Sequence, residues 1–169
     1  MCRAAEAVSP ARIKEGHSMS DKSSVYKATG SNTIGDATTG NNEPSARYQR
    51  GLAKMAEMFG EFGAKTVDSL ENSAPDLGRY LAEYVFGDVL SRPGLDLKSR
   101  EIATVAALTA LGTAGPQLRA HIRGALNVGC SQQEIIEIVM QMAVYAGFPA
   151  ALNGIQAAKE VFAERAAKK

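Results

Sequence analysis

Apolar residues recur at helical spacing from Pro44 to the end of the chain. Between Arg47 and Phe59 they return every three or four residues, which places them on one face of a helix. The same spacing, interrupted by Gly and Pro, predicts a short helix or turn over 64–72 and helices over 75–89, 97–111, 116–128, 131–145 and 149–165. No segment alternates as a strand would. The sequence therefore predicts an all-α fold.

The helix boundaries carry their own signals. Asp96 can cap the helix that follows it, and Gly112 suits the position just after that helix ends. Ser131 and Glu134 form the pattern of a capping box. Gly147 and Pro149 are expected to break the chain before a last helix.

Two of these helices are apolar nearly all round. Residues 102–111 contain two polar side chains, Thr104 and Thr109, and residues 135–144 contain Glu137 and Gln141. Such helices must be covered on every side, and a small domain offers too few neighbours. We therefore expect a homo-oligomer. The polar residues and the breakers after 145 argue against a membrane span.

The first part of the chain has a different composition. From Ser23 to Ser45, fourteen of 23 residues are Ser, Thr, Gly or Asn, so little apolar surface is available to offset the entropy of ordering. We expect residues 1–43 to be a flexible N-terminal extension, with residues 44–169 as the helical domain. Met19 offers a second candidate start.

Charge and composition exclude several classes of function. The 19 Lys and Arg residues against 18 Asp and Glu residues leave a formal charge of +1, which offers no field for nucleic acid or anionic lipid. With two Cys and two His in the chain, neither a disulfide framework nor a zinc site is expected. A reducing, cytoplasmic location fits this Cys usage.

A few polar side chains stand in apolar surroundings. His121 lies within a helix, flanked by Arg119 and Arg123, and Glu101 follows the cap at Asp96. Unaided, His121 fits a structural role, the two arginines a solvated cationic pair, and Glu101 a first-turn carboxylate favoured by the helix dipole. One helical stripe is either a solvated face or a set of buried groups that need partners: Glu134, Glu137, Gln141 and Tyr145. Cys130 is a lone thiol.

Several ordered segments resemble the carboxymuconolactone decarboxylase family. They are RPGLD at 92–96, LRAHIRGALNVG at 118–129, EIIE at 134–137 and YAGFPAA at 145–151, and RYQRG at 47–51 is similar to that family's opening helix. The resemblance covers roughly residues 46–165. It implies an alkylhydroperoxidase-D-like helical fold that assembles as a trimer or hexamer.

The resemblance also implies a chemistry. It points to decarboxylation, without a cofactor or metal, of 4-carboxymuconolactone or a close lactone acid to 3-oxoadipate enol-lactone, in aromatic compound catabolism. The peroxidase-like branch of the family carries a Cys-x-x-Cys pair followed four residues later by His. Ala114 and Gln117 occupy those cysteine positions here, which disfavours a disulfide cycle. Glu101 roughly matches the acidic residue of that branch's proton relay.

The resemblance suggests roles for individual residues. His121 is expected to deliver a proton, and Glu101 to set its charge state if the two helices meet. Arg119 or Arg123 is expected to anchor a substrate carboxylate, with Glu137 and Tyr145 nearby. Three alternatives remain: an enzyme of the same fold acting on another small acid or lactone, an alkylhydroperoxidase-like redox protein, and a non-catalytic oligomeric binding protein.

Overall fold

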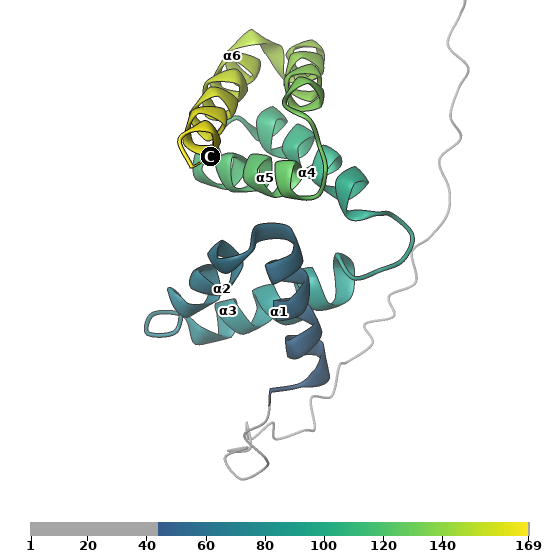
Figure 1. Ribbon diagram of the computed structural model, residues 1–169, viewed down its shortest axis with the longest axis vertical. Coiled ribbons are helices and arrows are strands. Elements are labelled where there is room, and N and C mark those ends of the chain that lie inside the picture. The colour runs from purple at the N-terminus through teal and green to yellow at the C-terminus, as the bar shows by residue number, and fades with distance from the viewer. Residues whose placement is uncertain (1–43, 169) are drawn as a thin grey trace, which may run out of the picture. The chain divides into compact units, whose positions relative to one another are not determined.

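The computed structural model describes residues 44–168, so the N-terminal extension expected over residues 1–43 lies outside the described part of the chain. Every regular element within 44–168 is a helix, which confirms the all-α prediction (Figure 1). The elements are α1 (Ala46–Phe59), α2 (Glu61–Asp68), α3 (Pro75–Tyr80), the π-helix η1 (Leu81–Val89), α4 (Leu97–Leu111), α5 (Gly115–Asn127) and α6 (Gln132–Ala166).

The predicted caps are present. The Asp96 side chain accepts a hydrogen bond from the backbone N–H of Ser99 at 2.7 Å, and Gly112 ends α4 with a φ of 69°. At the start of α6, Ser131 and Glu134 accept from each other's backbone N–H groups at 3.1 and 2.7 Å. Local hydrogen bonding therefore fixes where these two helices begin.

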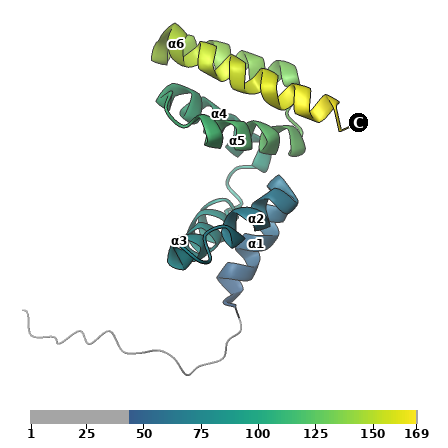
Figure 2. The ribbon, with the colours of Figure 1, turned by 90° about the vertical axis from the view of Figure 1, so that its left-hand side faces the viewer.

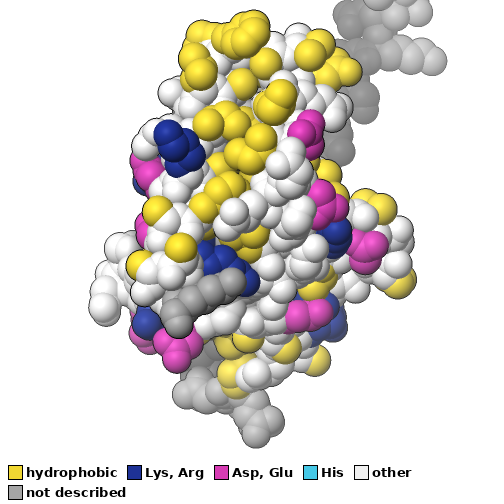
Figure 3. Space-filling view, turned by 45° about the horizontal axis from the view of Figure 1, so that its top comes forward, with side chains coloured by type: hydrophobic (Ala, Val, Ile, Leu, Met, Phe, Trp, Pro, Cys, Tyr) yellow, Lys and Arg dark blue, Asp and Glu magenta, His cyan; other side chains and the backbone are white. Residues whose placement is uncertain are grey.

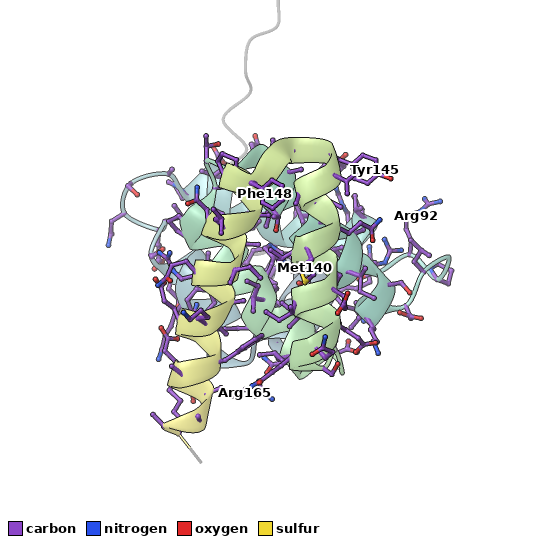
Figure 4. All side chains as sticks on the ribbon, turned by 90° about the horizontal axis from the view of Figure 1, so that it is seen from above. Arg92, Met140, Tyr145, Phe148 and Arg165 are labelled. Atoms are coloured by element: carbon purple, nitrogen blue, oxygen red, sulfur yellow. The ribbon has the colours of Figure 1, made fainter. Side chains whose placement is uncertain are left out.

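α6 consists of two helical arms. Gly147 has a φ of 83° and a ψ of 163°, so the chain turns back there, and Pro149 begins the second arm. Figure 4 shows the two arms side by side. An ideal Cβ on Gly154 would lie 2.8 Å from Cγ1 of Val139, which shows how closely the arms pack. By length and composition α6 could cross a membrane, but the reversal at Gly147 splits it into two shorter arms.

The segment 75–89 differs from the continuous α-helix that its pattern predicts. It begins as α3 and widens into η1 after Tyr80. η1 packs against α1, where an ideal Cβ on Gly51 would lie 1.9 Å from the carbonyl oxygen of Ala82. Apolar spacing does not separate the two helix types over so short a segment, because both place residues three to five apart on one face.

Two apolar clusters form the core. One joins α4, α5 and both arms of α6, and Figure 2 shows the arms of α6 lying over α4 and α5. The other joins α1 and η1 around Met58 and Phe86. The side-chain amide of Asn127 in α5 donates to the carbonyl oxygen of Met58 in α1 at 3.0 Å. This contact holds the end of α1 against α5.

Large apolar side chains remain exposed on α6 and at the end of α4. Figure 3 shows hydrophobic side chains gathered on this part of the surface. We call this set the apolar face; its members, between 56% and 79% exposed, are Leu111, Met140, Val144, Tyr145, Phe148 and Leu152. A surface of this kind is typical of a site that another protein covers.

The first arm of α6 should contribute a pH-dependent part of the stability. Glu134 accepts from Lys98 at 2.7 Å and from the Ser131 backbone, and these bonds lower its pKa to about 2. Because the folded state holds the carboxylate charged, this contribution is present above the ordinary pKa of 4.5 and is lost as the pH falls towards about 2. We expect Glu134→Gln to be less stable than the wild type near neutral pH, by a margin that shrinks on acidification.

Urea unfolding of both proteins at about pH 6 and about pH 3 measures that margin. An equal difference in unfolding free energy at the two pH values would contradict the prediction, because the charge of Glu134 would then contribute nothing to stability.

Candidate functional site

The structure brings His121 and Glu101 together. α4 and α5 pack against each other, and Nδ1 of His121 lies 3.1 and 3.0 Å from the two carboxylate oxygens of Glu101. The Glu101 side chain is fully buried. The interpretation of Glu101 as a first-turn carboxylate is wrong, because it is the fifth residue of α4 and faces α5. A buried carboxylate needs hydrogen-bond donors, and the imidazole supplies one.

Phe59 and Gly124 complete the surroundings of this pair. The Phe59 ring packs edge-to-face on the imidazole, with the ring centroids 5.3 Å apart. An ideal Cβ on Gly124 would lie 2.5 Å from Cε1 of Phe59 and 3.2 Å from Oε2 of Glu101. The absence of a side chain at Gly124 therefore makes room for both neighbours. The sequence indicated Phe59 as an apolar helix position and gave no sign of this contact.

The contact with Glu101 determines how the imidazole can act. An ionised Glu101 can only accept hydrogen bonds, so with Glu101 in that form the contact assigns the hydrogen to Nδ1 of His121. Within residues 44–168, no hydrogen bond is made to the other ring nitrogen, Nε2, and the His121 side chain is 24% exposed. The ring is thus held in orientation from one side and can exchange a proton with a bound molecule from the other.

The two predicted arginines lie away from His121. Each is two positions from His121 in α5, which places it on a different side of the helix. Arg119 lies 3.6 Å from Glu160, and Arg123 lies 2.6 Å from Glu164, both on the second arm of α6. The hydrogen bond and charge of Arg123 lower the pKa of Glu164. A role for either guanidinium in anchoring a substrate stays a prediction.

Glu137 and Tyr145 lie on the exposed side of α6. Glu137 accepts a hydrogen bond from Gln133 at 2.7 Å, and Tyr145 is 75% exposed beside the turn between the two arms (Figure 4). Neither residue lies on the buried side of α6 that faces α4 and α5. Their predicted place in a substrate site is untested.

Cys130 is a buried thiol between α5 and α6. Burial is the largest of the effects that raise its pKa, which disfavours the reactive thiolate. We expect Cys130 in a Cys2→Ser variant to react with a thiol reagent at least tenfold more slowly in the native protein than in the urea-unfolded protein, an order-of-magnitude expectation. Timed alkylation followed by mass spectrometry measures both rates. Equal rates would show that the native thiol is accessible and would restore a redox interpretation.

The described part of the chain contains no cluster of side chains suited to bind a metal ion. Within residues 44–168, no group of three or more His, Cys, Asp and Glu side chains is placed to hold a metal ion.

Comparison with known proteins identifies a family whose sequence profile this chain matches. The sequence profile of the carboxymuconolactone decarboxylase family matches residues 75–160, which include both Glu101 and His121. A 4-carboxymuconolactone decarboxylase of Acinetobacter baylyi is 34% identical over 117 residues, covering 69% of this chain and 87% of that protein.

Other relatives carry different names. A nitrosuccinic acid decarboxylase of Metarhizium robertsii is 37% identical over 75 residues, covering 44% of this chain and 52% of that protein. Peroxisomal protein 2 of Saccharomyces cerevisiae is 31% identical over 97 residues, covering 57% of this chain and 34% of that protein.

Proposed function

We propose that this chain, which belongs to the carboxymuconolactone decarboxylase family, releases CO2 from 4-carboxymuconolactone or a close lactone acid without a cofactor. The observation that carries the proposal is the pairing of His121 with the buried Glu101 within the family-matched region. Two relatives named as decarboxylases support carboxy-lyase chemistry in general.

The chemistry needs an acid more than it needs a nucleophile. In 4-carboxymuconolactone, the departing carboxylate is attached to a saturated ring carbon next to a C=C bond. This C=C bond is conjugated with the lactone carbonyl. When the C–C bond to the carboxylate breaks, its electron pair moves into this system and CO2 leaves. The resulting furan-like dienolate accepts a proton at the carbon next to the carbonyl, which gives the enol-lactone. The protein must stabilise the dienolate and deliver that proton.

His121 is the residue that we assign to proton delivery. Glu101 holds Nδ1, so the proton reaches the substrate from Nε2, and Glu101 is a positioning residue because it acts through the ring. A substrate with two carboxylates also needs cations. Arg123, with Arg119 as the alternative, is assigned to the carboxylate that stays on the product.

We also propose that a second copy of the chain covers the apolar face. Covering these side chains would remove exposed apolar surface from water, which favours association. A trimer or hexamer is the assembly that we expect. Sedimentation equilibrium tests it, and a monomer at micromolar concentration would contradict it.

The experiment that tests the function is CO2 release by the purified protein. The substrates to compare are 4-carboxymuconolactone and nitrosuccinic acid, the second because a relative is named for it. A higher kcat/KM for the lactone acid than for nitrosuccinic acid supports the proposal. Turnover of nitrosuccinic acid alone would support the same fold acting on another small acid. Release of CO2 from neither would contradict the proposal.

A further inference from the structure

A cavity of about 560 Å³ is bordered by α2, α5 and the second arm of α6, and its lining includes neither His121 nor Glu101. Its apolar lining comes from Phe59, Phe62 and Val161. Four cationic side chains, two carboxylates and Asn127 complete the lining, so the cavity carries more positive than negative charge. A volume of this order suits a small organic molecule.

Arg165 is the most informative of these cations. Its guanidinium donates to Oδ1 of Asn127 at 2.9 Å, and Asn127 in turn donates to the carbonyl oxygen of Met58 at 3.0 Å. Arg165 is exposed, and this one contact with a carboxamide orients its guanidinium without neutralising its charge. Within residues 44–168, Arg165 makes no ion pair, whereas Arg123 on the same cavity is paired with Glu164 at 2.6 Å.

A guanidinium held in advance loses less entropy when it binds an anion, and its planar shape suits a carboxylate. The phenyl rings of Phe59 and Phe62 add an apolar surface, which favours an organic anion over an inorganic one. The lining therefore fits an organic acid with a flat or unsaturated skeleton. The charge excess fits a molecule with two carboxylates better than one with a single carboxylate.

The cavity is one aromatic ring away from the imidazole. Phe59 lines the cavity and also packs on His121, with 5.3 Å between the ring centroids. The Phe59 ring therefore stands between His121 and a molecule in the cavity, and His121 itself does not line the cavity.

We propose that this cavity is a binding site for small organic dicarboxylates, distinct from the catalytic pair, with Arg165 and Arg123 holding the carboxylates. Arg165 is a binding residue that neither the sequence pattern nor the family resemblance singled out. Asn127 is its positioning residue.

Binding of adipate, a stable dicarboxylate, tests the cavity without any turnover. We expect adipate to bind the wild type more tightly than hexanoate does, and Arg165→Gln to weaken adipate binding by about tenfold. The matched control is Arg79→Gln, which removes the same charge from α3, outside the cavity, and should bind like the wild type. Titration calorimetry gives the affinities, and NMR of arginine Nε–H groups reports whether Arg165 is the group that shifts.

Equal adipate affinity in Arg165→Gln and the wild type would overturn the proposal, as would adipate that does not bind the wild type. Circular dichroism shows that each variant is folded. If adipate requires Arg165 but no lactone acid releases CO2, the cavity stands and the proposed function fails. If the wild type and Arg165→Gln release CO2 with the same KM while adipate binding is lost, the cavity and the proposed function both stand as separate sites.

Discussion

Replacing His121 with Asn should lower CO2 release from the lactone acid by about 10²- to 10⁴-fold, the range that a positioned acid or base contributes. Asn keeps a side-chain N–H that can donate to the buried Glu101, so the carboxylate is not left without a donor. It has no group that transfers a proton near neutral pH. The expected effect is therefore on kcat, with KM changed little.

Measurements of kcat, KM and the thermal unfolding midpoint separate chemistry from folding. If His121→Asn kept wild-type kcat, proton delivery by His121 would be wrong, and a structural role would be supported. The companion variant is Glu101→Gln, which keeps the shape but removes the charge. We expect it to retain more activity than His121→Asn and to shift the pH profile of kcat, a change that a purely structural Glu101 would not produce.

The sequence predicted the elements well where local chemistry determines them. The caps at Asp96 and Ser131 and the glycines at 112 and 147 mark helix ends by hydrogen bonding or positive φ, which neighbouring residues decide. The widening of the helix after Tyr80 was missed. It depends on how η1 packs on α1, which residues distant in sequence decide.

The site was harder to predict for the same reason. Glu101 and His121 are 20 residues apart, and the sequence alone placed Glu101 on the wrong part of its helix. The expectation that Glu101 sets the charge state of His121 depended on the two helices meeting, and in the structure they do. Phe59 and Arg165 come from opposite ends of the domain. No local pattern indicates that such residues line one cavity, because burial and pairing arise only when the helices assemble.

Gly51→Ala should be the most damaging single-methyl change to the fold. An ideal Cβ at this position would lie 1.9 Å from the carbonyl oxygen and 2.6 Å from the carbonyl carbon of Ala82, so α1 and η1 touch backbone to backbone. Backbone atoms cannot rotate away as a side chain can, so the two helices must separate. Separation would open the cluster around Met58 and Phe86. We expect a loss of about 3 kcal/mol or more in the free energy of unfolding.

Gly94→Ala is the matched control, because nothing lies within 4 Å of the Cβ that it adds in the loop before α4. Urea unfolding of the two variants, each compared with the wild type, measures the difference. A stable Gly51→Ala protein with a wild-type midpoint would mean that α1 and η1 can move apart freely. Because the end of α1 also carries Phe59, the same separation would shift that ring away from His121. Gly51→Ala should then lose CO2 release even at temperatures where it remains folded.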